Sequence, residues 1–237
     1  MAVLWSNQLR WYVGAHDLST ASTRSSVTLQ SPALDRTVYS NAAEVSQADV
    51  RRDEAEWAGL FEDSTRGLDS MIGTLIGTVG QMLSFAIGTT TGDRAYCGTV
   101  AVLSVKPEAR LGELVRVVGN FKPDGRFDPA KHFGPSQVIT TTGTSGSVDD
   151  GALSTGTHRM FVHLFRLGGG GTLSFNLQDS ATGTTFVDVS GATALFTATG
   201  STAIQFTGTL RRYVHGTYSF AGGSGSTDVF AAYGRTL

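Results

Sequence analysis

The chain has 237 residues and a formal net charge of -2, from 18 basic and 20 acidic residues. This length suits one large or two small domains, and the near balance of charge excludes a strongly basic nucleic-acid-binding protein and an acidic disordered tail. The single cysteine, Cys97, excludes a disulfide framework and a cysteine-based zinc site within the chain. With 16% charged residues and 30 glycines, the composition favours a β-rich fold over a helical bundle.

Four stretches of the first half are rich in β-forming residues. They predict strands over Trp11–Val13, Met82–Ile87, Ala95–Val105 and Glu113–Phe121. The turn-forming residues between the last two stretches predict that these strands form a hairpin.

One short helix is predicted over Leu68–Ile76. Leu68, Ile72, Leu75 and Ile76 follow the i, i+4, i+7, i+8 spacing that places apolar side chains on one helix face. The charged stretch from Asp49 to Glu62 fits either a strand or a helix.

Composition changes sharply near residue 135. All five prolines lie at or before this point, whereas 17 of the 30 glycines follow it. Residues 140–147 are small and polar with no apolar face to bury, which is typical of a linker. We therefore expect an N-terminal domain over residues 1–135, a Thr/Gly/Ser linker over 136–150 and a C-terminal domain over 151–237.

The last third of the chain predicts six to eight short antiparallel strands. Leu173, Phe175 and Leu177 alternate with polar residues, a period of two that places them on one face of a strand. Similar stretches lie between Gly/Ser/Asp turns, and Gly168–Gly171 is expected to close a hairpin between Met160–Leu167 and Thr172–Leu177. The pattern predicts a small antiparallel sandwich, jelly-roll or immunoglobulin-like.

No catalytic or metal-binding constellation stands out. His158 and His163 are five residues apart and face opposite sides of a predicted strand, so they cannot hold one metal ion together. Cys97 lies within a strand without a nearby base and is expected to be a buried, unreactive thiol. We therefore expect a protein that is not an enzyme and that has no cofactor, no metal and no membrane segment. Because its first residues lack a signal-peptide pattern, we expect it to be made in the cytoplasm.

Several short segments of the first half of the chain resemble a known family. Val3-Leu4-Trp5, the run from Trp11 to Ser19, and Gly-Asp-Arg-Ala-Tyr leading into Gly-Glu-Leu-Val over residues 92–115 are similar to tail tube (major tail) proteins of long-tailed bacteriophages. The resemblance implies a mainly β fold: an N-terminal tail-tube-like β-sandwich or barrel with one short helix, followed by an added, surface-facing C-terminal β-sandwich.

The resemblance also implies a function in the virion tail, assembled in the host cytoplasm. Six copies would form a ring, rings would stack into a tube, and double-stranded DNA would pass through the lumen without sequence-specific binding. Its partners would be further copies of itself and other phage tail proteins. The connection Ser31–Asp63 would contact the next ring through complementary charges. These residues are Arg36, Asp49, Arg51, Arg52, Asp53, Glu54 and Glu56.

Two alternatives remain open at this point. One is a capsid decoration protein or another accessory virion protein. The other is a carbohydrate-binding adhesin module, in which Tyr213, Tyr218 and Tyr233 supply the aromatic faces that sugars stack on.

Overall fold

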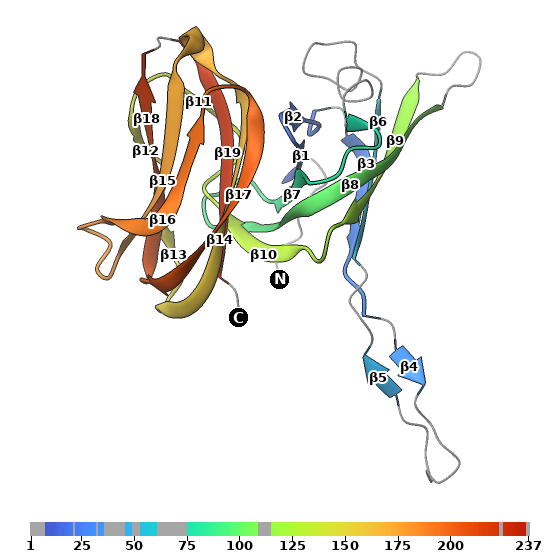
Figure 1. Ribbon diagram of the computed structural model, residues 1–237, viewed down its shortest axis with the longest axis horizontal. Helices are drawn as coiled ribbons and strands as arrows, with labels where there is room; N and C mark the ends of the chain where they lie inside the picture. Colours follow the sequence, from blue (N-terminus) through green and yellow to red (C-terminus); the bar gives the residue numbers. More distant parts are fainter. Residues whose placement is uncertain are drawn as a thin grey trace.

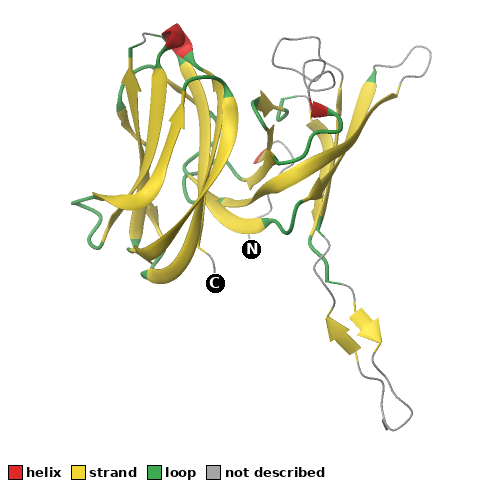
Figure 2. Cartoon of the chain, viewed as in Figure 1, coloured by secondary structure: helices red, strands yellow, loops and turns green. Residues whose placement is uncertain are grey.

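The computed structural model describes residues 8–20, 22–31, 33–35, 46–48, 53–60, 75–108, 115–222 and 225–235. This part of the chain is built almost entirely from antiparallel strands, and its helical residues are confined to short turns such as the 3-10 turn Gly168–Gly170 (Figure 2). The predicted mainly β fold class is confirmed. The predicted helix Leu68–Ile76 falls outside the described residues except for its last two positions.

The strands follow one another along the chain in the order labelled in Figure 1. The first ten are β1 (Leu9–Val13), β2 (His16–Asp17), β3 (Ser22–Thr28), β4 (Ala33–Asp35), β5 (Ser46–Ala48), β6 (Glu54–Leu60), β7 (Gln81–Ile87), β8 (Arg94–Glu108), β9 (Arg116–Pro123) and β10 (Asp128–His132). The others are β11 (Gln137–Ile139), β12 (Gly143–Thr144), β13 (Val148–Asp149), β14 (Ser154–Arg166), β15 (Thr172–Ser180), β16 (Val187–Phe196), β17 (Gly200–Leu210), β18 (Tyr213–Ala221) and β19 (Thr227–Arg235).

One large sheet runs through both halves of the chain. Its main path is β17-β14-β19-β10-β8-β7-β1-β2, and a branch continues from β8 through β9 and β6 to β3. A second sheet contains β12, β18, β15 and β16, with β13 paired to β18, and β4 and β5 form a separate pair. Figure 1 shows the β4–β5 pair projecting away from the body of the molecule.

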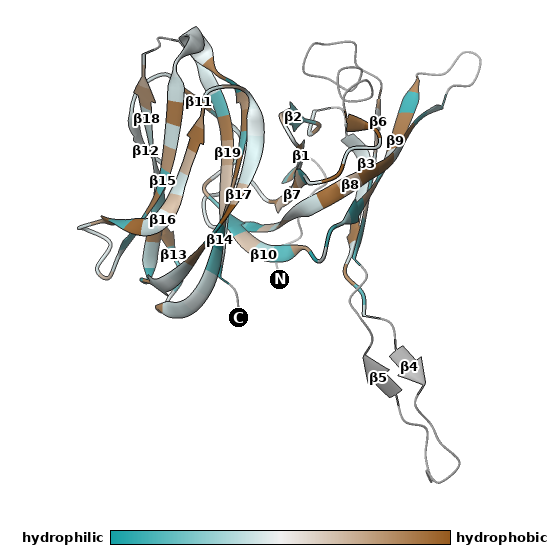
Figure 3. Ribbon diagram, in the orientation of Figure 1, coloured by the Kyte–Doolittle hydropathy of each residue, from teal (hydrophilic) through white to brown (hydrophobic). Residues whose placement is uncertain are grey.

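Strands β14 and β19 form a middle layer that is buried on both faces. Met160, Val162 and Leu164 of β14 pack against β15 and β18 of the second sheet. The alternate residues Phe161 and Phe165 pack against the first half of the chain, in a cluster with residues of β1, β7, β8 and β10. Because both faces are covered, β14 carries a nearly continuous apolar run rather than an alternating one. Figure 3 colours the strands by hydropathy, with apolar residues in brown and polar residues in teal.

Two predicted features of the second half turn out differently. Gly168–Gly171 does not close a hairpin, because β14 pairs with β17 and β19 whereas β15 pairs with β16 and β18. The glycines instead carry the chain from one sheet to the other, with φ of 70° at Gly169 and 66° at Gly170, values that favour glycine.

The expected linker contains β11, β12 and β13, which pair with β19 and β18. The domain boundaries themselves stay a prediction.

The first half has its own core beneath β6, β8 and β9. Trp57 of β6 and Trp11 of β1 are fully buried, together with Val117 and Phe121 of β9. Within the Asp49–Glu62 stretch, which fitted either a strand or a helix, Glu54–Leu60 form the strand β6, and residues 49–52 and 61–62 lie outside the described residues. The residues of β6 alternate between this core and solvent, as a strand covered on one face requires.

Candidate assembly interface

The branch β8–β9–β6–β3 is a four-stranded antiparallel segment with one covered and one open face. Register places Ser26 of β3 opposite Glu56 of β6, Glu56 opposite Asn120 of β9, and Asn120 opposite Ser104 of β8. These four polar residues form one row across the segment. The Asn120 side chain donates a hydrogen bond of 3.0 Å to the Ser104 hydroxyl, which links β9 to β8 at one end of the row. The opposite face carries Trp57 and closes over the core.

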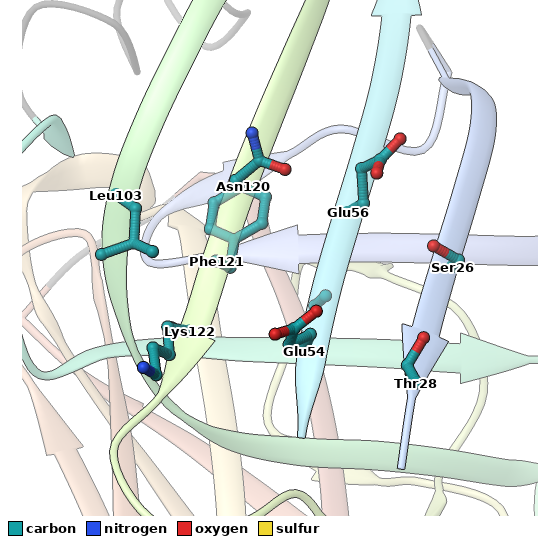
Figure 4. Close-up of a pocket in the computed structure, with 9 residues that line it drawn as sticks. Ser26, Thr28, Glu54, Glu56, Leu103, Asn120, Phe121 and Lys122 are labelled. Atoms are coloured by element: carbon teal, nitrogen blue, oxygen red, sulfur yellow. The ribbon is translucent and has the colours of Figure 1, made fainter. Parts of the chain in front are cut away.

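The open face holds a shallow groove with a volume of about 280 Å³. Figure 4 shows Glu54 and Glu56 projecting from β6, between residues of β3 on one side and of β9 on the other. The residues lining the groove are Ser26, Thr28, Glu54, Ala55, Glu56, Leu103, Asn120, Phe121 and Lys122. The groove is therefore a polar surface with two carboxylates, one ammonium group and one exposed leucine, and it suits contacts rather than acid–base chemistry on an enclosed substrate.

The structure separates the residues expected to mediate ring stacking. Arg36, Asp49, Arg51 and Arg52 lie outside the described residues. Glu54 and Glu56 lie on β6, on the open face of the sheet. Asp53 is buried, and its carboxylate accepts a 2.9 Å hydrogen bond from the Phe127 backbone N–H. Asp53 thus fastens the start of β6 to the core, and the stacking role of the whole set stays a prediction.

Sequence reasoning identified Glu54 and Glu56 but missed their neighbours in the groove. Asn120 lies in a predicted strand and Lys122 just beyond its end, yet the strand beside them is set by the β6–β9 pairing, which joins residues more than 50 positions apart. The available signal was the alternation over residues 54–57, where two glutamates interleave with Ala55 and Trp57. That pattern marks a strand with one covered and one solvent-facing side.

Two edges of this segment have no strand beside them within the described part of the chain. β3 pairs only with β6. β8 pairs with β7 as far as Val100 and with β9 to its end, so residues 104–108 are paired on one side only, and Leu103 lies at a bulge in the β8–β9 pairing. Two apolar side chains lie close to this second edge: Leu103 is 59% exposed and Val79 is 78% exposed. Val79 follows Thr78, whose backbone carbonyl accepts a hydrogen bond from the Val102 N–H.

No family model matches the chain. No curated protein matches it either. Among solved structures, the chain is similar to a component of the tail of an empty GTA particle with C6 symmetry, at 13% identity over 53% of this chain and 97% of that one, with a TM-score of 0.41.

Two further solved structures are similar over most of the chain. One is the SPP1 Dit protein (gp 19.1), described as a paradigm of the hub adsorption apparatus in Gram-positive infecting phages, with 16% identity over 95% of this chain and 98% of that one and a TM-score of 0.34. The other belongs to the phage P2 baseplate in its activated conformation with Ca, with 9% identity over 96% of this chain and 98% of that one and a TM-score of 0.34.

His158, His163 and Cys97 are buried and contact neighbouring residues of the core. His158 and His163 lie on opposite faces of β14, as predicted, with His158 beside Phe206 and His163 between the two halves of the chain. Cys97 is fully buried, as predicted, and burial raises the pKa of its thiol to about 12. Within the described ranges, no group of three His, Cys, Asp or Glu side chains could hold a metal ion, and no helix is long and apolar enough to cross a membrane.

The tyrosines considered for sugar stacking do not present open faces. Tyr233 is 2% exposed and belongs to the core of the second half. Tyr218 packs against that core and donates a hydrogen bond to the Thr144 carbonyl oxygen. The Tyr213 ring is covered by the Arg212 guanidinium, 4.9 Å from its centroid, and by Gly183. The aromatic platform that a sugar-binding module needs is therefore not formed by these three residues.

Proposed function

We propose that this chain is a structural subunit of a phage tail that associates edge to edge into rings, and that the rings stack into a tail tube around a channel for DNA. The observation that carries the proposal is the branch β8–β9–β6–β3, which has an unpaired edge on each side among the residues that the structure describes. Exposed sheet edges invite pairing with another chain, and closing a sheet into a ring removes them. The chain works through its surfaces and not as an enzyme.

Strand directions favour this closure. β8, β9, β6 and β3 are successively antiparallel, so β3 runs opposite to β8. Copies related by rotation about a ring axis keep the same strand directions relative to that axis. β3 of one copy placed beside residues 104–108 of β8 in the next therefore continues the antiparallel pattern without interruption. This contact would also cover Leu103 and Val79.

The same arrangement assigns the two faces of the segment. The face bearing Trp57 is covered by the core of its own subunit. The polar face with Glu54, Glu56, Asn120 and Lys122 would then line the channel. Its mixture of charges suits a wall that DNA passes without being held, because firm binding to DNA depends on a surplus of basic groups.

The ring contact is tested with two matched leucine variants. Leu103→Lys places a charge at the proposed contact, and Leu195→Lys places the same charge on β16 of the second half, where the leucine is 67% exposed. Charges on an edge oppose strand pairing. We expect the wild type and Leu195→Lys to form rings in sedimentation velocity and negative-stain microscopy, and Leu103→Lys to stay monomeric. Equal assembly of both variants contradicts the proposed contact.

The stacking role of the connection between β3 and β6 is tested by shortening it. Thr28 pairs with Glu54, so replacing residues 30–52 by Asn-Gly leaves Leu29 and Asp53 flanking a two-residue hairpin turn that keeps the register of both strands. This variant removes Arg36, Asp49, Arg51 and Arg52 but keeps β6. We expect single rings that do not stack into tubes. Tubes of normal length would show that stacking uses another surface.

A further inference from the structure

A second cavity, of about 250 Å³, opens where β8, β10 and β19 meet. The strand register builds its floor. Arg94 of β8 lies directly opposite Lys131 of β10, and Lys131 lies directly opposite Tyr233 of β19. Arg235, two residues further along β19, and Asp150, which follows β13, complete the cavity. Residues from both halves of the chain therefore meet in one place.

The single carboxylate in this cavity is already fully engaged. Lys131 Nζ lies 2.7 Å from Asp150 Oδ1, and Arg235 Nε lies 2.7 Å from Oδ2. The Tyr233 hydroxyl donates a 2.6 Å hydrogen bond to the same Oδ2. Asp150 is thus held by two cations and one hydroxyl, and its side chain is only 8% exposed.

The cavity keeps a surplus of positive charge. Arg94, Lys131 and Arg235 face one carboxylate, which leaves two positive charges uncompensated. Arg94 forms no ion pair or hydrogen bond with any residue in the described ranges, and it stands opposite Lys131, a like-charge pairing that destabilises antiparallel strands. The carboxylate on β10, that of Asp128, is occupied by Arg126 and Arg159, at 3.0 and 2.6 Å.

We propose that this cavity binds a phosphate group, with Arg94 and Lys131 as its principal ligands. Inorganic phosphate or a phosphomonoester carries about -1.5 to -2 charges at pH 7, which matches the surplus of two, whereas a carboxylate or a backbone phosphodiester would leave one charge uncompensated. The planar guanidinium of Arg94 has several donors free for a bidentate contact. Lys131, 41% exposed, has ammonium donors beyond the one directed at Asp150. The site requires no self-association and is independent of the proposed ring.

The test measures binding of inorganic phosphate to the full-length chain by calorimetry at pH 7.5, at constant ionic strength maintained with chloride. Arg94→Gln and Lys131→Gln are expected to weaken binding about tenfold or more each, the effect of losing one charge-assisted contact. Lys106→Gln is the control, because Lys106 is 73% exposed and pairs with Glu108 at a distance from the cavity. Arg94→Lys keeps the positive charge but removes the bidentate geometry of the guanidinium. It should therefore bind phosphate more tightly than Arg94→Gln and less tightly than the wild type.

A short DNA duplex distinguishes the source of the phosphate. If Arg94→Gln weakens the binding of inorganic phosphate and of the duplex alike, the site also accepts the singly charged phosphodiester of a nucleic-acid backbone; if it weakens only the binding of inorganic phosphate, the site selects the more highly charged free anion. Thermal unfolding confirms that each variant is folded. Wild-type binding that Arg94→Gln and Lys131→Gln leave unchanged, or no binding of phosphate at millimolar concentration, overturns the proposal.

Discussion

His163 makes a sharp prediction about stability in acid. Its side chain is fully buried between the two halves of the chain. Nδ1 lies 2.8 Å from the Gly14 carbonyl oxygen, which can only accept a hydrogen bond, so Nδ1 carries the proton. Nε2 lies 2.8 Å from the Ser84 hydroxyl and accepts its hydrogen bond. Burial disfavours the protonated ring and outweighs the opposite effect of the Gly14 carbonyl, so the pKa of His163 is lowered from 6.5 to about 4.

The lowered pKa of His163 determines the sign and the size of the change in folding stability with pH. In the unfolded chain His163 takes up a proton as the pH falls below 6.5, while the folded chain resists protonation down to about pH 4. The contribution to stability is therefore present above pH 6.5 and is lost as the pH falls towards 4. One pKa unit corresponds to about 1.4 kcal/mol, so the loss is about 3 kcal/mol.

The comparison that isolates His163 is His163→Gln. The glutamine amide can donate to Gly14 and accept from Ser84 but does not titrate. Urea unfolding between pH 7.5 and pH 4 should show the free energy of unfolding of the wild type falling by about 3 kcal/mol more than that of the variant. Because His132 and His158 also have lowered pKa values through burial, only this difference reports on His163. Parallel pH profiles for the two proteins would refute the reasoning.

Two further predictions concern packing. Cys97 should not react with an aromatic disulfide reagent in the folded protein and should react fully in urea, since its thiol is buried and protonated; rapid reaction of the native chain would contradict this. Gly216→Ala should destabilise the chain by about 1–3 kcal/mol in thermal or urea unfolding, because its Cβ would collide with the Phe175 ring. Gly200→Ala is the matched control, because a Cβ added at this position meets no atom within 4 Å. An equal loss of stability in both variants would show that a backbone effect, and not the collision with Phe175, causes the loss.

Local patterns in the sequence were sufficient to predict most strands and the hairpin of β8 with β9, but not the pairing of strands far apart in the chain. Alternation over residues 173–177 reflects a strand with one covered face, and that strand is β15. The glycine run after residue 167 indicated a turn correctly, yet the turn connects two different sheets. A turn signal reports a change of chain direction; the sheet that each strand joins depends on side-chain packing across the whole core.

The two surfaces proposed as functional differ in how far the sequence could reveal them. Glu54 and Glu56 occupy one face of a single strand, so a local pattern was enough. Arg94, Lys131 and Arg235 are ordinary charged residues in three separate strands and become a cluster only through the pairing of β8 with β10 and of β10 with β19. The spacing of these residues along the chain therefore gives no indication that they lie together.

The double burial of β14 bears on how the two halves act together. Phe161, Phe165 and Phe230 of the second half pack against Tyr12 of β1 and its neighbours, with ring centroids of Tyr12 and Phe230 4.2 Å apart. The large sheet also continues from β19 through β10 into β8. Separating the halves would expose this aromatic cluster and break a sheet in its middle. In a ring closed through β3 and β8, the sandwich formed by the second half would therefore keep a fixed orientation relative to the channel wall, because the strands that carry it belong to the same sheet as that wall.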